Sequence, residues 1–295
     1  MTVLRGKDAL LHYSLLEGQA RAVLIDSTRL CAAARRTHHL SDTATIALGR
    51  LLTGAAIMGD MLKEENGSIT VRMNGGGQGG SLIAVSDFKG NPRGYAQVPG
   101  LLIMPDDNGQ LDITGAVGSS GTFSVVKDFG AGEPYIGQIP IVKGNVSEDI
   151  TAYYAVSEQI PTVVLLGVIF DKIWNFSRAG GLFIQLLPAA DEREIEIIEK
   201  NLKEQPKIEA MLENGLSMEE ICQKVMTGFN LELLSEDEVS YKCNCSLERV
   251  KCSLMTLDKG EIIKMANEEE SIEVCCHFCD KKYNLSSQEL LDLIK

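Results

Sequence analysis

Cysteines dominate the C-terminal end of this chain. Six of its eight cysteines lie at or after Cys243, and four form two close pairs, Cys243-Asn244-Cys245 and, 30 residues later, Cys276-His277-Phe278-Cys279. A segment of about 55 residues rarely buries enough apolar surface to fold without disulfides or a metal ion. The cysteines therefore decide whether residues 241–295 can form a folded domain.

The cellular compartment helps to decide between disulfides and a metal ion. Lys7 and Asp8 interrupt the N-terminal region where a signal peptide needs an unbroken apolar run. The longest apolar helical stretch, residues 44–62, contains Arg50 and Asp60 and is not expected to span a bilayer. We therefore expect a cytoplasmic protein, whose thiols are kept reduced.

In a reducing compartment, two close cysteine pairs favour a Zn²⁺ site over structural disulfides. Four thiolates complete a tetrahedral shell and leave no position for an activated water, so the ion is expected to be structural rather than catalytic. The C-x-C pair is unusual, because most structural zinc sites use C-x₂₋₄-C. Each pair is also close enough to form a disulfide when the metal leaves, and thiolates are the reactive form of cysteine. A redox function in addition to the structural site stays open at this point.

The remaining cysteines and the histidine of the second pair have simpler interpretations. Cys252 and Cys275 are each either a substitute ligand or a small buried hydrophobic side chain. Cys31 and Cys222 are expected in the hydrophobic core. His277 is not expected to bind the metal, because four cysteines already complete the shell.

The chain carries a net charge of −13, and this charge is unevenly distributed. Residues 1–188 and 241–295 each carry −2, whereas residues 189–240 carry −9. This shift predicts an N-terminal core domain over 1–188, an acidic linker over 189–240 and a small zinc domain over 241–295. So acidic a chain is not expected to bind nucleic acid or an anionic membrane, because both interactions depend on Lys and Arg.

Local patterns predict an α+β fold for the N-terminal domain. Short runs rich in Val, Ile and Leu between turn residues predict strands at 68–73, 81–88, 122–127, 135–142, 162–170 and 182–187. A helix is predicted from Ser41 or Asp42 to about Lys63, and because it is apolar on every side it should be buried. Another helix is predicted to follow Ser147 as N-cap and to end before Pro161.

The linker is predicted to be helical and the zinc domain to be mixed. The first linker helix is predicted to open at Asp191 and to have an apolar face formed by Ile195, Ile198 and Leu202. Ser217 and Glu220 form a capping box at the start of a later helix, and Pro206 and Gly215 break the helical pattern. Such short, charged helices hold mainly by packing against other structure, so the linker is either an ordinary connector or an element that docks and can be released. In the zinc domain, one helical face is predicted from Leu247, Val250, Leu254 and Leu257. Two strands are predicted at 272–274 and 283–285, and Ser286 and Glu289 form a second capping box.

Two further motifs suggest functions that the pattern does not support. The run 74–80 is rich in glycine but lacks the Gly-Lys-Ser/Thr ending of a phosphate loop and precedes a predicted strand, so it indicates a hairpin. Arg35, Arg36, His38 and His39 indicate a solvent-exposed loop, or a contact for an acidic partner or for the linker. No catalytic arrangement is identifiable from spacing, so we do not expect an enzyme.

Taken together, these features resemble the heat shock protein 33 family of redox-regulated bacterial chaperones. The resemblance rests on the C-x-C, the gap near 30 residues and the C-x-x-C, and on two N-terminal segments, residues 86–99 (SDFKGNPRGYAQVP) and 114–162 (beginning TGAVGSSGTF). It covers essentially the whole chain. Cys275, directly beside Cys276, departs from the family pattern.

The resemblance implies an ATP-independent holdase that binds unfolding proteins under oxidative stress. It implies that Cys243, Cys245, Cys276 and Cys279 bind one Zn²⁺ per chain in a reduced, inactive state. It further implies that oxidation forms the disulfides Cys243–Cys245 and Cys276–Cys279, releases the metal, unfolds the zinc domain and linker, and leads to a homodimer. The residues that bind client proteins are not identified.

Two other functions share the cysteine pattern. A zinc-ribbon protein that binds nucleic acid would carry a basic stripe, which residues 241–295 lack. A thiol–disulfide oxidoreductase would place Cys276-x-x-Cys279 at a helix N-terminus, whereas the pattern places this pair between two short strands.

Overall fold

The structure is a computed structural model that describes residues 7–15, 20–104, 111–187 and 192–294. The chain divides into two compact units, Met1–Tyr241 and Lys242–Lys295, which we call the large unit and the small unit. Both contain helices and antiparallel strands, so the predicted α+β class is confirmed. Within the described ranges, no helix combines the length and apolarity needed to cross a membrane.

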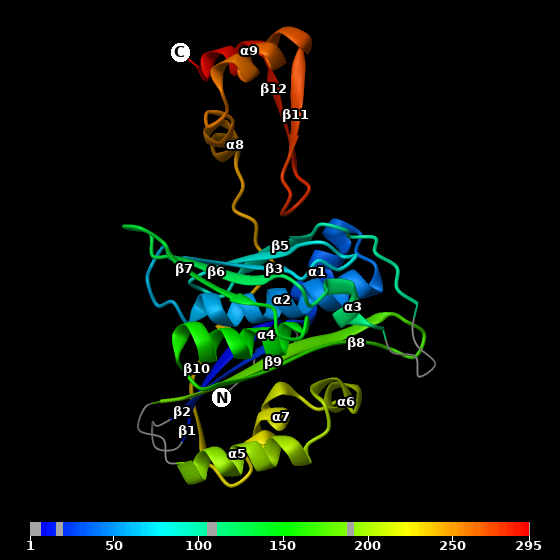
Figure 1. Cartoon of the computed structure of the whole chain (residues 1–295), viewed down its shortest axis with the longest axis vertical. Helices are drawn as coiled ribbons and strands as arrows, with labels where there is room; N and C mark the ends of the chain where they lie inside the picture. The colour runs from blue at the N-terminus through cyan, green and yellow to red at the C-terminus, as the bar shows by residue number, and fades with distance from the viewer. Residues whose placement is uncertain (1–6, 16–19, 105–110, 188–191, 295) are drawn as a thin grey trace. The chain divides into compact units, whose positions relative to one another are not determined.

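Two five-stranded antiparallel sheets form the framework of the large unit (Figure 1). The first has the order β10-β1-β2-β9-β8, with bounds Leu231–Glu238, Ala9–Leu15, Ala20–Asp26, Phe176–Leu186 and Thr162–Phe170. The second has the order β5-β4-β3-β6-β7, with bounds Pro92–Ala96, Leu82–Asp87, Ser68–Asn74, Thr122–Asp128 and Tyr135–Pro140. All six predicted strands are present, and the structure adds β1, β2, β5 and β10.

Helix α2 (Asp42–Asp60) packs against strands of both sheets and is buried along most of its length. The helix begins at Asp42, as predicted, and Ser41 caps it, because its hydroxyl accepts a hydrogen bond from the Ala44 amide at 3.2 Å. A Cβ atom on Gly59 would lie 2.6 Å from the Asp87 carbonyl oxygen, so only glycine allows this close approach to β4. The all-round apolarity of α2 is thus explained by a sheet on each side.

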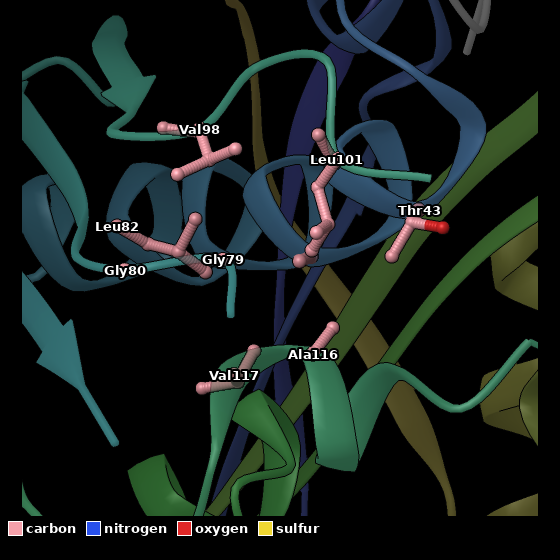
Figure 2. A pocket seen from close by; sticks show the side chains of 11 residues that line it. Thr43, Gly79, Gly80, Leu82, Val98, Leu101, Ala116 and Val117 are labelled. Atoms are coloured by element: carbon pink, nitrogen blue, oxygen red, sulfur yellow. The ribbon is translucent and has the colours of Figure 1, made fainter. Parts of the chain in front are cut away.

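A short helix, α3 (Ile113–Val117), lies near the N-terminal half of α2. Side chains from α2, β4, α3 and the segment after β5 line a small apolar cavity of about 10 Å³ there (Figure 2), and they include Thr43, Leu82, Leu101 and Val117. The glycine-rich run 74–80 connects β3 to β4, which pair as an antiparallel hairpin, as predicted.

Helix α4 (Val146–Tyr153) continues into one turn of π-helix, η2 (Tyr154–Glu158). Its N-cap is Asn145 rather than the predicted Ser147. The Asn145 side chain accepts a hydrogen bond from the Ser147 amide at 3.1 Å, which makes Ser147 part of the first helical turn.

Helix α1 (Thr28–His38) occupies the segment that was expected to be a loop. The loop interpretation of Arg35, Arg36 and His38 is therefore wrong, and only His39 lies outside the helix, at its C-cap. Arg35 donates to Asp42 at 2.8 Å and lies 4.9 Å above the Phe170 ring, so this basic group is used inside the large unit.

The N-terminus of α1 is capped from a distant part of the chain. The Asp8 carboxylate accepts hydrogen bonds from the amides of Arg29 and Leu30 at 2.9 and 2.6 Å, whereas the side chain of Ser27, at the N-cap position, caps nothing. Asp8 is buried, and burial raises its pKa to about 6 even though these amides oppose the shift.

Three linker helices cover the face of the first sheet that lies away from α2 (Figure 1): α5 (Glu192–Glu204), α6 (Ile208–Glu213) and α7 (Met218–Val225). Their apolar side chains form a second core with that sheet. The predicted capping box of Ser217 and Glu220 is present, whereas Asp191 lies outside the described residues. Residues 231–238 form strand β10 and not a helix, because they pair with the edge strand β1.

The small unit contains three helices and a hairpin: α8 (Leu247–Leu254), α9 (Lys259–Glu268), β11 (Ser271–Cys275), β12 (Lys282–Ser286) and α10 (Ser287–Asp292). The two predicted strands and the predicted capping box of Ser286 and Glu289 are confirmed. Its core is small, since the buried cluster among the described residues has four apolar side chains: Ile262, Ala266, Leu285 and Leu290. Helix α8 buries none of its residues.

Candidate metal centre

Two tight backbone arrangements within the small unit position the four cysteines. Cys243 and Cys245 lie in the segment that ends at Ser246, the N-cap of α8. Cys276 and Cys279 lie in the turn between β11 and β12. This turn is closed by hydrogen bonds from the amides of Cys279 and Asp280 to the Cys276 carbonyl, at 3.2 and 2.8 Å.

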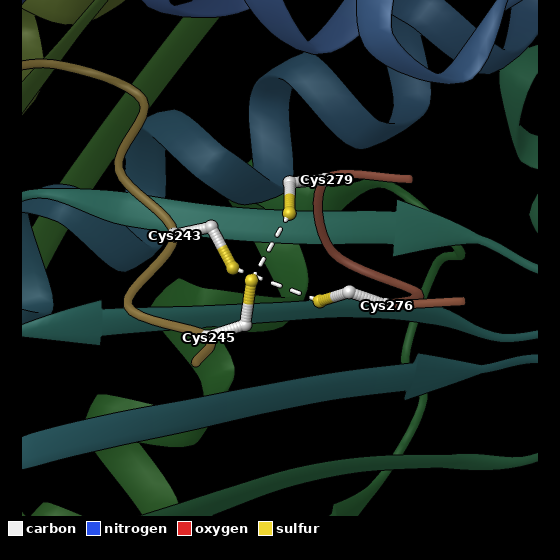
Figure 3. Close-up of side chains that lie close together, drawn as sticks. All are labelled: Cys243, Cys245, Cys276 and Cys279. Atoms are coloured by element: carbon white, nitrogen blue, oxygen red, sulfur yellow. Dashed lines mark hydrogen bonds between the residues drawn. The ribbon is translucent and has the colours of Figure 1, made fainter. Parts of the chain in front are cut away.

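The four sulfurs point toward one another (Figure 3), and all lie within 4.8 Å of each other. Cys243 Sγ lies 3.7 Å from Cys276 Sγ, and Cys245 Sγ lies 3.4 Å from Cys279 Sγ. A disulfide needs an S–S distance of about 2 Å, and all four cysteines are free thiols. Four sulfurs at about 2.3 Å around a tetrahedral Zn²⁺ lie about 3.8 Å apart. The group therefore has the size to hold a metal ion, and its donors are consistent with zinc.

The electrostatics of the group also fit a cation. Burial raises the pKa of the Cys243 and Cys279 thiols, and hydrogen bonding with neighbouring thiols raises that of Cys279 further. Burial opposes ionisation of Cys245 as well, but hydrogen bonds from Tyr283 and the other thiols outweigh it and lower the Cys245 pKa to about 7. Four thiolates this close repel one another, and a bound divalent cation removes that obstacle.

Tyr283 also belongs to this site, although the sequence pattern identified it only as the first residue of a predicted strand. It lies on β12, is mostly buried, and donates a hydrogen bond from its hydroxyl to Cys245 Sγ at 3.1 Å. Such a donor orients a metal ligand and stabilises its charge. No ligand spacing marks Tyr283, so only its place on the returning strand could have suggested it.

The other cysteines and His277 lie outside the four-cysteine group within the described ranges. Cys252 and Cys275 are exposed, so their interpretation as small buried side chains is wrong. Cys31 and Cys222 are core residues, as expected, and burial raises the pKa of each thiol to about 12. These two thiols are therefore inert as nucleophiles near neutral pH.

The comparisons with known proteins agree along the whole chain. A family model described as Hsp33 protein matches residues 8–286. A 33 kDa chaperonin of Clostridioides difficile is 41% identical over 98% of this chain and 99% of its own length. Another of the same name, from Acetivibrio thermocellus, is 39% identical over 98% of this chain and 97% of its own length.

A solved structure gives the same result for the fold. The crystal structure of the 33 kDa chaperonin (heat shock protein 33 homolog) of Thermotoga maritima superposes with a TM-score of 0.87 at 31% identity, and the match covers 98% of both chains. These names describe chaperones and not enzymes, in line with the expectation from sequence. By family match, sequence identity and fold, the chain belongs to the Hsp33 family.

Proposed function

We propose that this chain is a cytoplasmic, ATP-independent holdase that oxidation activates. In the reduced state Cys243, Cys245, Cys276 and Cys279 bind one Zn²⁺ and the protein is inactive. Oxidation then forms the disulfides Cys243–Cys245 and Cys276–Cys279 and releases the metal. Unfolding proteins are the partners, and the oxidised chain forms a homodimer.

The observation that carries this proposal is that the core of the small unit is small for the number of helices and strands that it holds together. Its core cluster has four buried apolar side chains among the described residues, yet the unit holds three helices and a hairpin. The four-cysteine group joins the segment before α8 to the β11–β12 turn, whereas the apolar side chains of α8 are only partly buried against the core. Bound zinc supplies folding free energy to such a domain, about 10–16 kcal/mol in small zinc peptides.

The cysteines also supply the chemistry of a switch. When two thiolates become a disulfide they lose two electrons, which hydrogen peroxide accepts as its O–O bond breaks and, with two protons, becomes water. Both sulfurs then lose the negative charge that a cation requires. Within each pair the sequence separation is short, so both disulfides can form inside the small unit.

The linker helices offer a second element that can change state. They cover apolar residues of the first sheet, and two arginines of the large unit hold α6. Arg50 donates to the Glu209 carboxylate at 2.6 Å, and Arg178 donates to the carbonyls of Leu212 and Leu216 at 3.3 and 2.9 Å. Release of these helices would expose apolar surface that binds unfolded chains without nucleotide.

The backbone connection supports coupling between the two elements. Tyr241 ends the large unit, where its hydroxyl donates to the Gly94 carbonyl at 2.8 Å and lies 2.9 Å from His38 Nε2. Cys243 follows two residues later, and β10 precedes Tyr241. Disorder that begins at the cysteines can therefore spread along the chain into β10 and the linker helices.

The two alternative functions find no support in the geometry. Cys276 and Cys279 lie in a strand–turn–strand, whereas an oxidoreductase needs its C-x-x-C at a helix N-terminus. The net charge of −13 opposes nucleic-acid binding.

The test is aggregation of a denatured client protein, measured by light scattering, with this protein either reduced and zinc-loaded or treated with peroxide under mild heat. Zinc release is followed in the same sample with a colorimetric chelator. Suppression only after oxidation, with about one zinc released per chain, is the expected result. Equal suppression in both states would leave a chaperone with a purely structural metal site, and no suppression in either state would refute the holdase proposal.

A further inference from the structure

The Tyr283 hydroxyl reaches the metal centre from outside the two cysteine motifs. Strand β12 alternates exposed and buried residues, so Tyr283 and Leu285 point to the same side of the β11–β12 hairpin. Leu285 is fully buried in the core of the small unit, and Tyr283 is 8% exposed. The core therefore fixes the phenol ring, and the ring presents its hydroxyl to Cys245 Sγ at 3.1 Å.

Cys245 differs from two other cysteines of the group in the kind of donor that contacts its sulfur. The amide of Cys245 donates to Cys243 Sγ, and the amide of Lys281 donates to Cys279 Sγ. Each of these amides lies two residues after the sulfur that it contacts, so the same backbone bends place cysteine and donor. The donor to Cys245 is a side chain 38 residues away. It can therefore be removed by substitution while the backbone of both motifs is kept.

The ring of Tyr283 also carries a cation on its face. Lys281 Nζ lies 5.0 Å from the ring centroid, which is within the range of a cation–π interaction. A positive charge over the ring withdraws electron density from the phenol, and this polarisation makes the hydroxyl a stronger hydrogen-bond donor. Lys281 is exposed, so its effect on the hydroxyl can be varied separately from the packing of the core.

A hydrogen bond to sulfur affects both properties on which the proposed switch depends, metal binding and reaction with peroxide. A thiolate attacks peroxide through a sulfur lone pair: an S–O bond forms, the O–O bond breaks, and the leaving hydroxide takes up a proton to become water. A second thiolate then displaces the oxygen of the sulfenic acid, which leaves as water after protonation, and the disulfide is formed. A donor that shares the lone pair makes the sulfur a poorer nucleophile and stabilises its charge as a ligand.

We propose that Tyr283 is a positioning residue that raises the amount of peroxide needed to open the metal centre. Its hydroxyl holds Cys245 as a metal ligand and slows the attack of that sulfur on the oxidant. Lys281 strengthens the effect through the ring. The inference deepens the proposed function, because it names residues that set the sensitivity of the switch, and it rests on the oxidative metal release proposed above.

The substitution Tyr283→Phe removes the hydroxyl and keeps the ring in the core. Zinc-loaded, full-length protein is mixed with hydrogen peroxide, and zinc release is followed with a colorimetric chelator. The second-order rate of release should be about tenfold higher than in the wild type, as expected for the loss of one hydrogen bond to a charged group. Zinc affinity, measured by competition with a chelator under reducing conditions, should fall roughly tenfold.

The Co²⁺-substituted protein separates a contact with sulfur from a general loosening of the small unit. A hydrogen bond to a thiolate lowers the energy of the sulfur electrons, so the loss of this bond in Tyr283→Phe should shift the sulfur-to-cobalt charge-transfer absorption to longer wavelength. The d–d absorption, which reports tetrahedral geometry, should stay as in the wild type. A purely structural role of the ring would leave the charge-transfer absorption where it is.

Two lysine variants grade the effect. Lys281→Met keeps the hydroxyl and removes the cation over the ring, so peroxide-driven release should become about two- to threefold faster. Lys282→Met is the matched control, because Lys282 is the adjacent exposed lysine and pairs with Glu273 at 2.8 Å instead. It should release zinc at the wild-type rate. Lys281→Met also tests the inference if Tyr283→Phe fails to fold.

Three outcomes would overturn the inference: a wild-type rate of zinc release in Tyr283→Phe, an unchanged charge-transfer absorption, or equal rates in the two lysine variants. None of these measurements uses a client protein, so each can fail while oxidation still activates aggregation suppression. Conversely, zinc release that depends on Tyr283, in a protein that suppresses no aggregation, would refute the holdase proposal and leave this inference standing.

Discussion

The large unit buries two apolar cores, one on each face of its first sheet, and residues such as Phe123, Tyr153 and Phe183 are fully enclosed in the core between the two sheets. The core cluster of the small unit has four buried apolar side chains, and helix α8 contributes none of them. Buried apolar area stabilises the large unit by the hydrophobic effect, whereas a four-cysteine group joins the parts of the small unit. A redox or metal signal can therefore unfold the small unit, and with it release the linker helices and β10, while the core between the two sheets of the large unit stays folded.

The largest expected effect comes from removing the metal centre. Cys276→Ser, or chelation of the zinc, should unfold the small unit, because about 10 kcal/mol of metal-binding free energy is lost. Limited proteolysis should then cut within residues 242–295 and, where the linker is released, within residues 192–240, while Trp174 emission, which reports on the sheets of the large unit, stays as it was. Cys252→Ser is the control, since Cys252 is exposed and outside the group. Loss of both units together would refute the division.

The opposite experiment weakens the large unit alone. Leu51 is fully buried in α2 between the sheets, so Leu51→Ala should cost about 3 kcal/mol through the cavity it leaves. Thermal unfolding of the large unit should move to lower temperature with zinc still bound at one per chain. Leu234→Ala, at a 61% exposed position, should change little. Zinc loss in folded Leu51→Ala would show that the units depend on each other.

A smaller effect is expected where the linker meets the core. Glu209→Gln leaves the buried Arg50 guanidinium without its counter-charge, and Arg50 Nε already has no hydrogen-bond partner among the described residues, so α6 should be destabilised by about 2 kcal/mol. Hydrogen exchange should quicken over residues 208–225 with zinc retained. Glu213→Gln, on an exposed position of the same helix, is the matched control. Unchanged exchange would mean that apolar packing alone holds α6.

The smallest expected effect is a pH dependence of stability that has opposite signs in the two units. The Asp8 pKa is raised to about 6 in the folded state, so the stability that its protonation contributes is present at low pH and is lost as pH rises through about 6. Between pH 7 and pH 5 this amounts to about 1 kcal/mol in favour of the large unit. Protons compete with the metal for thiolates, so the small unit should weaken over the same range.

Asp8→Asn isolates the contribution of Asp8. The free energy of unfolding is obtained from thermal unfolding at pH 7 and at pH 5 for the wild-type chain and for Asp8→Asn. The increase from pH 7 to pH 5 should be about 1 kcal/mol larger for the wild-type chain than for Asp8→Asn. Exposed carboxylates titrate alike in both proteins and cancel. Identical pH dependence of the two proteins would show that Asp8 does not titrate in this range.

Short-range patterns carried much of the information about this protein. The cysteine spacing, the two capping boxes, the all-apolar helix α2 and six strands were all readable, because each depends on neighbouring residues or on a fixed period. The same patterns failed where distant partners decide the local structure. Residues 231–238 became a strand because β1 offers an edge to pair with, and α1 is capped by Asp8, which lies some 20 residues earlier in the sequence.

Four cysteines with metal-ligand spacing, in a segment too short for a large core, can be recognised without any coordinates. Only the tertiary structure decided that their sulfurs meet within 4.8 Å, that the Tyr283 hydroxyl donates to Cys245, and that Cys252 and Cys275 lie outside the group. It also decided which apolar side chains stay in water, among them Leu102 and Trp174. The physical reason is that spacing limits the reach of the chain, whereas burial and contact depend on which distant segments pack together.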